Sequence, residues 1–320
     1  MSQSGVAILG IFVADLAFRA AGMPAVGETI AGSGFAMGPG GKGSNQAVAA
    51  ARCGAKVTFI SKIGRDAFGE VALSTWQREG ITARVAQSGT EPTGAAFIYV
   101  NERTGENAII VVSGAAATVS PGDVHAAAEA IAGARVFVTQ LEQPADAALR
   151  GLQIARRSGV ITIFNPAPAI AFDEEVYGLC DYITPNESEA AALTGIEVRG
   201  LQDAQRAGDV FLAKGVGTAL ITLGEKGALL QNRKGSVHIP AFNASPVVET
   251  AGAGDAFNGG FAAALARGDA PLEAARFACA VAAISVTRAG TAPSMPTLEE
   301  VERLLAGGSG QLRGSNSAFR

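Results

Sequence analysis

A glycine-rich segment late in the chain has the residue types needed for phosphoryl transfer. Residues 249–261 read ETAGAGDAFNGGF, so Asp255 directly follows the small residues Gly252, Ala253 and Gly254. Small residues at the start of a helix leave backbone N–H groups unpaired at the positive end of the helix dipole, where an anionic phosphoryl group can bind. A carboxylate beside such an anion hole can accept the proton of an attacking hydroxyl, and the dipole is expected to favour its ionised form. An aspartate that only caps the helix would give the same pattern.

A second glycine-rich segment lies near the N-terminus. Residues 38–46 read GPGGKGSNQ and precede a helix expected at 47–52. The segment is not a P-loop, because a glycine rather than Ser or Thr follows its lysine. It is not the dinucleotide fingerprint of dehydrogenases either, because in those enzymes G-x-G-x-x-G directly follows the first strand. Its glycines allow a ligand to approach the backbone closely, while Lys42 and Asn45 add an ammonium and an amide. A tight turn capped by Ser44 or Asn45 is the alternative.

The elements that must position these segments follow an alternating pattern. From about residue 120 onward, short apolar runs alternate with Ala-rich helical stretches, which predicts βαβ units and a mostly parallel sheet covered by helices on both faces. Ligands in such α/β folds bind beyond the carboxyl ends of the strands. The expected strands are 136–139, 160–164, 182–184 and 219–223, and the expected helices begin near Pro121, Ala145, Asn186 and Leu201.

The N-terminal part of the chain predicts a separate small sheet. Residues 95–100 and 107–112 alternate in polarity around a polar turn, which is typical of a hairpin with one exposed face. We therefore expect one domain at 1–306 with a small antiparallel sheet, from about 13–40 and 93–112, that acts as a lid. The glycine- and serine-rich tail at 307–320 has too few apolar residues to order itself, and we expect it to be flexible.

Composition narrows the class of protein. The 320 residues include 25 basic and 29 acidic side chains, and this balance argues against a nucleic-acid binder, which needs a basic surface. Three cysteines without a C-x-x-C pair predict neither a disulfide framework nor a zinc site. We see no signal-peptide pattern and no apolar run of about 18 residues, so we expect a cytoplasmic protein without a membrane partner.

Five ordered motifs resemble those of one enzyme family. Over about residues 5–305, the chain resembles the ribokinase (PfkB) family of carbohydrate and nucleoside kinases. The motifs are GGKGSNQA at 40–47, NPAPA at 165–169, TPNESE at 184–189, TLGEKG at 222–227 and GAGDAFNG at 252–259. The resemblance implies a three-layer α/β/α domain with a mostly parallel central sheet and a small β-sheet lid. It also implies ATP-dependent transfer of the γ-phosphoryl group to a primary hydroxyl of a small sugar, ribose or a related one.

The resemblance also implies roles for individual residues. Asp255 corresponds to the general base, with Gly252, Ala253 and Gly254 as the anion hole. The implied sugar contacts are Asp15, Gly41, Lys42, Asn45 and Glu142. The implied nucleotide contacts are Asn186, Thr222, Gly224, Lys226, Gly227 and Cys279. Glu189 is expected to help place Mg²⁺ through water, which suits an ion that dehydrates reluctantly, and Glu249 corresponds to a ligand of a monovalent cation.

Two residues depart from the family pattern. Val13 stands where the family usually has Asn, and an unpaired sugar hydroxyl against this valine would cost about 1–3 kcal/mol. Val13 therefore weakens the case for ribose as the natural substrate and leaves a sugar with a different or absent hydroxyl at that place as an alternative. Glu249 stands where the family usually has Asp, and its extra methylene leaves open the K⁺ activation that residues 287–294 otherwise imply.

Other functions remain as alternatives. A nucleoside kinase would need apolar side chains that stack on the base, and the candidates are Phe12, Phe97 and Tyr99. A phosphosugar kinase would need a basic cluster, but the expected lid contains only Arg19 and Arg103. A sugar- or nucleotide-binding regulator without activity would gain nothing from Asp255. The family resemblance further implies a homodimer in which the apolar face of the lid strands is buried.

Overall fold

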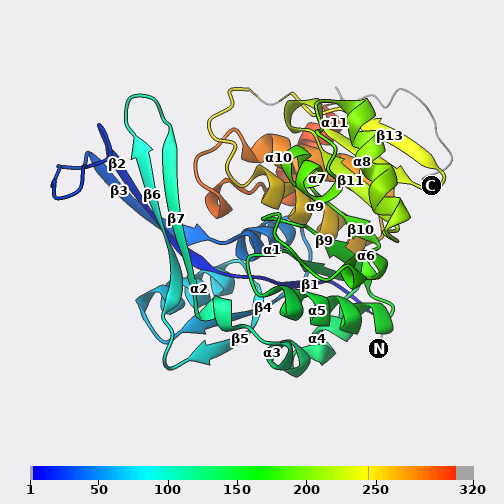
Figure 1. The fold of residues 1–320 in the computed structure, drawn as a ribbon, viewed down its shortest axis with the longest axis horizontal. Helices are drawn as coiled ribbons and strands as arrows, with labels where there is room; N and C mark the ends of the chain where they lie inside the picture. Colours follow the sequence, from blue (N-terminus) through cyan, green and yellow to red (C-terminus); the bar gives the residue numbers. More distant parts are fainter. Residues whose placement is uncertain (1–2, 244, 308–320) are drawn as a thin grey trace.

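The computed structural model describes residues 3–243 and 245–307 and contains two sheets (Figure 1). The larger sheet has nine strands in the order β13-β12-β11-β10-β9-β8-β1-β4-β5. Its strands from β11 to β5 in this order run parallel, and an antiparallel hairpin of β12 and β13 completes one edge. The bounds are β1 Val6–Leu9, β4 Val57–Gly64, β5 Thr82–Ser88, β8 Val136–Thr139, β9 Ile161–Phe164, β10 Tyr182–Ile183, β11 Thr218–Thr222, β12 Ala228–Asn232 and β13 Gly235–Ile239.

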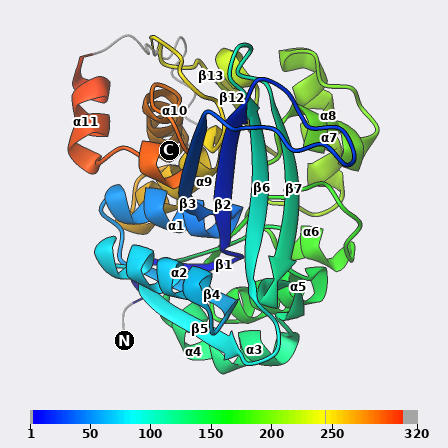
Figure 2. The same cartoon turned by 90° about the vertical axis from the view of Figure 1, so that its left-hand side faces the viewer.

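Helices cover both faces of this sheet (Figure 2). Successive strand residues face opposite sides, so Ile8 packs in one core with helices α1, α2, α9, α10 and α11, whereas Leu9 packs in the other with α3 to α8. This arrangement confirms the predicted three-layer α/β/α fold. The helix bounds are α1 Lys42–Arg52, α2 Ala67–Arg78, α3 Pro121–Ala126, α4 Ala128–Gly133, α5 Ala145–Arg157, α6 Glu175–Leu179, α7 Glu187–Thr194, α8 Leu201–Ala213, α9 Ala253–Arg267, α10 Pro271–Ser285 and α11 Leu298–Ala306, with short 3₁₀ turns η1 Ala115–Thr118, η2 Gly224–Lys226 and η3 Ala292–Ser294.

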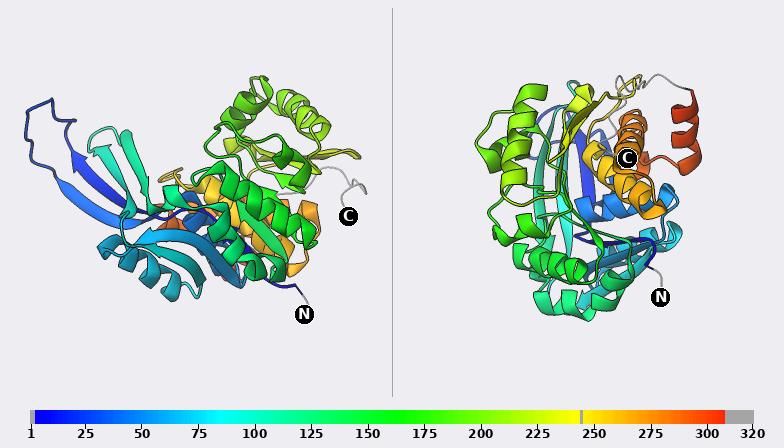
Figure 3. Two further views of the ribbon diagram at one scale, coloured as in Figure 1. Left: turned by 60° about the horizontal axis from the view of Figure 1, so that its bottom comes forward. Right: turned by 90° about the vertical axis from the view of Figure 1, so that its right-hand side faces the viewer.

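The second sheet projects away from the first (Figures 1 and 3). Its strands are β2 Val13–Ala20, β3 Gly34–Gly40, β6 Thr93–Asn101 and β7 Asn107–Gly114, in the order β3-β2-β6-β7. The central pair, β2 and β6, is parallel, so the prediction of a purely antiparallel sheet is wrong. The reason is that β2 follows β1 and β6 follows β5, and these two strands of the parallel sheet end at the same edge.

The helix expected at 47–52 begins five residues earlier, at Lys42. Gly41 precedes it with a φ of 89°, a conformation that favours glycine, and a Cβ there would meet the carbonyl oxygen of Ile11. No side chain caps this helix, so the alternative of a turn capped by Ser44 or Asn45 is wrong. The Ser44 hydroxyl instead accepts a hydrogen bond from Trp76 Nε1 at 3.0 Å, inside the protein.

The other predicted elements agree well with the structure. Helices α3, α5 and α8 begin at Pro121, Ala145 and Leu201 as expected, and Asn186 is the N-cap of α7. Among residues 3–243 and 245–307, no helix has the length and apolar character that a membrane crossing requires. The expected flexible tail at 307–320 lies, except for Gly307, outside the described residues.

Candidate active site

The two glycine-rich segments meet at the N-terminal ends of α1 and α9. Asn45 and Asp255 are 210 positions apart in the chain, yet Asn45 Nδ2 donates a hydrogen bond to Asp255 Oδ2 at 3.0 Å. Gln46 Nε2 donates to the other carboxylate oxygen, Oδ1, at 3.2 Å. The fold therefore brings the predicted base and the predicted sugar-binding segment into direct contact.

Asp255 does not cap helix α9, so that alternative is wrong. Gly252 is the N-cap, with a φ of 80°, and Asp255 is the third residue of the helix. Burial raises the pKa of the Asp255 carboxyl, although Lys42 and the amides of Asn45 and Gln46 oppose this effect. The helix dipole is expected to favour the ionised form of this carboxyl, but burial has the larger effect and the pKa is raised. A raised pKa makes the carboxylate a stronger proton acceptor, as a general base requires.

The start of α9 leaves room for an anion. Apart from its chain neighbours and the nearby backbone of its own helix, no heavy atom of the described residues lies within 4 Å of the place that a Cβ at Gly254 would take. The N–H of Ala253 donates to the carbonyl of Thr250 at 3.2 Å, so this member of the predicted anion hole already has a partner. The open space beside Gly254 is where a phosphoryl group can approach the helix terminus.

The predicted sugar contacts lie around the same point. Glu142 Oε2 accepts a hydrogen bond from the Lys42 N–H at 2.7 Å, and the Asp15 carboxylate lies against Gly40, next to Gly41. Burial, assisted by the charge of Asp255, raises the pKa of Asp15 to about 6. Burial also raises the pKa of Glu142 to about 7, against the effect of Lys42. These carboxyl groups can accept hydrogen bonds from adjacent sugar hydroxyls when they are ionised.

Lys42 is surrounded by acidic groups. Its pKa is raised first by Asp255 and then by Glu142 and Glu189, while burial opposes this rise. Burial and the charge of Asp255 raise the pKa of Glu189 in turn. One ammonium thus faces three carboxylates from different parts of the chain, and the excess negative charge suits ligands that carry hydroxyl donors or a bound cation.

Asn186 and Glu189 form a reciprocal cap at the start of α7. The Asn186 side chain accepts from the Glu189 N–H at 2.8 Å, and Glu189 Oε2 accepts from the Asn186 N–H at 2.9 Å. Within the described part of the chain, no three His, Cys, Asp or Glu side chains are grouped to hold a metal ion. A single carboxylate such as Glu189 still fits Mg²⁺ carried by nucleotide phosphates, because this ion usually keeps several waters.

The predicted nucleotide loop is built from glycine conformations. Gly224 has a φ of 52° and Gly227 a φ of 93°, and a Cβ at Gly227 would collide with the carbonyl oxygen of Ile239. The N–H of Thr222, at the end of β11, donates to the carbonyl of Pro185 at 3.0 Å, which joins this loop to the segment before α7. The loop and the α7 cap therefore lie next to each other, as a shared nucleotide site requires.

Two predicted nucleotide contacts have other surroundings. The exposed Lys226 Nζ donates to the carbonyl of Arg199 at 3.1 Å. Cys279 is buried in α10, and burial raises its pKa to about 12, so the thiol stays neutral. The structure gives Lys226 a partner outside the predicted site and makes Cys279 a core residue.

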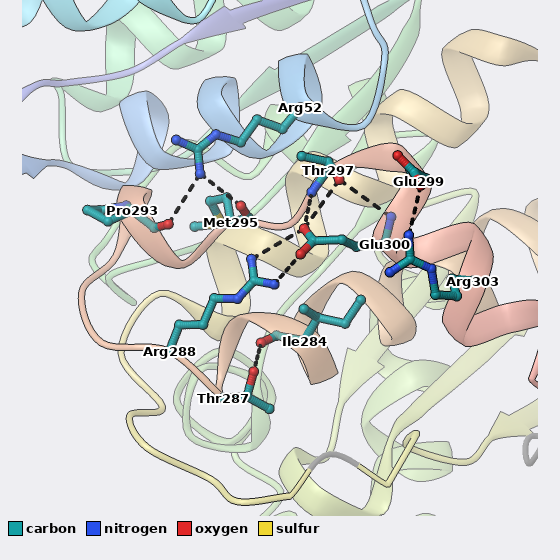
Figure 4. A network of polar contacts seen from close by, with 10 residues as sticks. All are labelled: Arg52, Ile284, Thr287, Arg288, Pro293, Met295, Thr297, Glu299, Glu300 and Arg303. Carbon is teal, nitrogen blue, oxygen red and sulfur yellow. Dashed lines mark hydrogen bonds and ion pairs between the residues drawn. The ribbon is translucent and has the colours of Figure 1, made fainter.

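Ion pairs anchor the segment that follows α10 (Figure 4). Arg52 donates to the carbonyls of Pro293 and Met295 at 3.2 and 2.8 Å. Arg288 pairs with Glu300 at 2.5 Å, and this contact, with the cap of α11, lowers the pKa of Glu300 to about 2. The segment is thereby fixed at both of its ends.

This anchored segment borders the anion hole. A Cβ at Gly252 would lie 3.2 Å from the Cα of Thr291, and the Thr291 hydroxyl donates to the carbonyl of Pro39 at 3.3 Å. Glu249 Oε2 accepts a hydrogen bond from the Gly290 N–H at 2.8 Å. The carboxylate expected at a monovalent-cation site therefore already holds the segment through a backbone N–H.

The aromatic residues considered for base stacking do not face the site. Phe12 is fully buried in the main core, edge-on to Trp76 at 5.7 Å between ring centroids. Asp15 pairs with Ala96 in the register of β2 and β6, so these two side chains face the same side of the small sheet. Phe97 and Tyr99 lie one and three positions after Ala96 in β6, so their side chains point to the opposite face. These positions do not supply the platform that a nucleoside kinase needs.

Several buried amides at this site received no role from the sequence. Their hydrogen bonds lie next to Asp255 or at the start of α9. Gln46 donates to Asp255, and the side chains of Gln140 and Asn165 both bond to Gln46. Asn258 donates to the carbonyl of Gly254. The available signal was a polar residue inside a small, apolar helical run for Gln46 and Asn258, and a polar residue at the carboxyl end of a strand, β8 or β9, for Gln140 and Asn165. Their partners lie far away in the chain, so the signal alone does not identify them.

Comparison with known proteins agrees with this geometry. A model of the pfkB family of carbohydrate kinases matches residues 3–298. A ribokinase from Haemophilus influenzae is 42% identical over 93% of this chain and 97% of its own length, and a deoxyribokinase from Salmonella typhimurium is 36% identical over 94% and 98%. The structure of an Arabidopsis thaliana ribokinase complexed with ribose and ATP superposes with a TM-score of 0.88 at 29% identity, over 95% of this chain and 99% of that one. The chain therefore belongs to the pfkB family of carbohydrate kinases.

Proposed function

We propose that this chain is an ATP-dependent sugar kinase that transfers the γ-phosphoryl group to a primary hydroxyl, with Asp255 as general base. The observation that carries the proposal is the Asp255 carboxyl, buried with a raised pKa beside the open space at Gly254. Membership of a carbohydrate kinase family and the ribokinase and deoxyribokinase relatives support it. Residues 1–306 would act as one kinase domain, with the small sheet as its lid.

The side chains divide the work of this reaction. Asp255 accepts the hydroxyl proton as the hydroxyl oxygen attacks phosphorus, while Asp15 and Glu142 orient the sugar through its other hydroxyls. Lys42 and the N-terminus of α9 favour the negative charge on the transferring group. Mg²⁺ bound with ATP would neutralise phosphate charge, and Glu189 would hold it through water. The backbone of Gly224 and Gly227 would contact the nucleotide.

Val13 favours a pentose that lacks one hydroxyl. Alternation along β2 puts Val13 on the same face as Asp15, and its side chain packs with Ile11, Ala96 and Ala116. This wall offers no polar side chain to a sugar hydroxyl placed against it. We therefore propose a deoxypentose such as deoxyribose as a better substrate than ribose, in line with the two kinds of relative found.

The contact made by Glu249 concerns activation of the enzyme by K⁺. Its hydrogen bond to Gly290 joins the two segments that a monovalent cation in this place would also join. We propose that this contact replaces the ion, so K⁺ should stimulate the enzyme little.

The lid also has an apolar outer face suited to a second copy. Phe18, Phe35 and Ile110 are exposed on the side opposite Asp15, and the Phe18 ring lies 5.0 Å from that of Phe35. We propose that this face is buried in a homodimer. A cytoplasmic location agrees with three free, buried cysteines.

The test is ATP consumption by the purified protein with Mg²⁺ against free sugars, sugar alcohols and nucleosides, each with and without K⁺. Asp255→Asn should lower kcat at least about 100-fold and leave sugar binding within about tenfold. Asp269→Asn, just beyond the other end of α9, is the control and should keep full activity. Undiminished turnover by Asp255→Asn would reject the mechanism. Wild-type activity on nucleosides alone would favour a nucleoside kinase. Sugar or nucleotide binding without any turnover by the wild type would favour a regulator.

A further inference from the structure

A buried hydrogen-bonded relay lies directly beneath Asp255. Gln140 Nε2 donates to Gln46 Oε1 at 2.5 Å, and Gln46 Nε2 donates to Asp255 Oδ1 and to Asn165 Oδ1, both at 3.2 Å. Gln46 and Gln140 are fully buried, with 0% of their surface exposed. Buried amides of this kind are costly unless their hydrogen bonds are satisfied, so their presence under the site calls for a physical reason.

The contacts fix which end of the Gln46 amide faces the carboxylate. The carbonyl oxygen of the amide is engaged by Gln140, and its two N–H bonds point to Asp255 and Asn165. A flipped amide would put its oxygen against two acceptors and its NH₂ against a donor. The Gln140 side-chain oxygen occupies space that only glycines leave open, since a Cβ at Gly10 would lie 2.5 Å and one at Gly43 3.1 Å from it.

A second branch returns to the anion hole. Asn165 Nδ2 donates to the carbonyl of Thr184 at 2.9 Å, and the Thr184 hydroxyl donates to Asn258 Oδ1 at 2.6 Å. Asn258 Nδ2 then donates to the carbonyl of Gly254 at 2.9 Å. The relay therefore joins the base and the start of α9 through four motifs that are distant in the chain.

We propose that Gln46 is a positioning residue for phosphoryl transfer, which holds the Asp255 carboxylate toward the substrate, and that Gln140 acts through Gln46. The inference rests on the proposed function, because it assigns Asp255 as the base. Asn45 holds the second carboxylate oxygen, so the two neighbouring amides together fix the carboxylate plane. Both donors are neutral, and they orient the carboxylate without cancelling its charge.

The central test replaces Gln46 by an unbranched apolar side chain of similar length. Gln46→Met should lower kcat roughly 10- to 100-fold, as expected for one hydrogen bond to a charged group, while KM for sugar and for ATP changes less than about threefold. Loss of a donor to the carboxylate also raises its pKa, so the acidic limb of the pH–kcat profile should move to higher pH. The charged groups that also face Asp255 are Lys42, Asp15, Glu142 and Glu189, and they are unchanged in the variant.

Two further variants separate hydrogen bonding from packing. Gln46→Glu keeps the shape but removes the obligatory donor, and it should move the acidic limb upward at least as far as Gln46→Met. Gln140→Met should cause a smaller loss of kcat, and it should add almost nothing in the Gln46→Met background, because it acts through the same contact. Gln231→Met is the control. Gln231 is also buried, but it lies in β12, in the antiparallel hairpin at the edge of the large sheet, and donates a hydrogen bond to Asp209 of α8.

A titration of the Asp255 carboxyl by ¹³C NMR, assigned with Asp255→Asn, gives a readout that does not need turnover. The proposal expects a higher pKa in Gln46→Met than in the wild type. An unchanged titration together with a kcat within about twofold of wild type would overturn it, as would fully additive losses in the double variant. If Gln46→Met fails to fold, the Gln46→Glu and Gln140→Met results decide in the same way. A wild-type protein without sugar kinase activity but with the predicted titration shift would instead reject the proposed function alone.

Discussion

Replacing Val13 with Asn should shift the substrate preference from deoxyribose toward ribose. Val13 is only 4% exposed and packs with Ile11, Ala96 and Ala116, so a sugar hydroxyl placed there loses its water partners and gains none. An unsatisfied buried hydroxyl costs about 1–3 kcal/mol. That cost corresponds to a change of about 5- to 150-fold in the ratio of kcat/KM for the two sugars.

The assay compares kcat/KM for ribose and deoxyribose in three proteins, the wild type, Val13→Asn and Val13→Thr. Threonine has almost the shape of valine and adds only a hydroxyl, so Val13→Thr should move the ratio in the same direction without a change of volume. Thermal unfolding of each variant shows whether the wall remains intact. A wild type that already prefers ribose, or variants that fold normally and keep the wild-type ratio, would refute the reasoning.

Three further predictions use other parts of the structure. Burial raises the pKa of Glu142 to about 7 from 4.5, so between these pH values the folded protein holds a proton that the unfolded chain releases. Its contribution to the free energy of unfolding must therefore fall as pH rises through this window, and urea titrations should show a flatter pH dependence for Glu142→Gln. Glu249→Asp should shorten the reach to Gly290 and make activity more dependent on K⁺, which a K⁺ titration of both proteins would reveal. Phe18→Glu should dissociate the proposed homodimer in sedimentation experiments; a dimer mass that does not change would place the contact elsewhere, and a monomeric wild type would refute the proposal.

The main architecture could be predicted because its signals lie within short segments of the sequence. Buried parallel strands appear as short apolar runs, and helices such as α3 begin at residues with strong start signals, Ser120 and Pro121. The start of α1 was misjudged because it depends on the backbone at Gly41, while Ser44 and Asn45 turn inward to partners from distant segments. Pattern within a segment does not reveal such partners.

The pairing of the small sheet was missed for a related reason. The hairpin of β6 and β7 is local, and it was found from its alternation. The parallel pairing of β2 with β6 depends on where β1 and β5 end in the large sheet. The topology of the large sheet therefore determines the parallel pairing of β2 with β6, which the alternation of side chains and the turn residues do not reveal.

The candidate residues were easier to name than their electrostatics. Asp255 and Lys42 follow from motifs and Glu142 from the family resemblance, and the structure brings the three together. The sequence shows that Asp255 lies at a helix start, where the dipole favours its ionised form, but it does not show burial, which is a property of the whole fold. Burial then reverses the expected direction of the shift.

The buried residues around Asp255 show how a general base can be held rigidly and still keep a raised pKa. A cation directly beneath Asp255 would fix the carboxylate, but it would also lower its pKa and weaken it as a proton acceptor. The structure instead places neutral amides, Gln46 and Gln140, on the protein side, and a single ammonium, Lys42, among the carboxylates. Lys42 and then the neutral donors Asn45 and Gln46 oppose the effect of burial only in part, since the pKa of Asp255 remains raised. The amide layer thus supplies the orientation, and burial preserves the basicity that proton transfer needs.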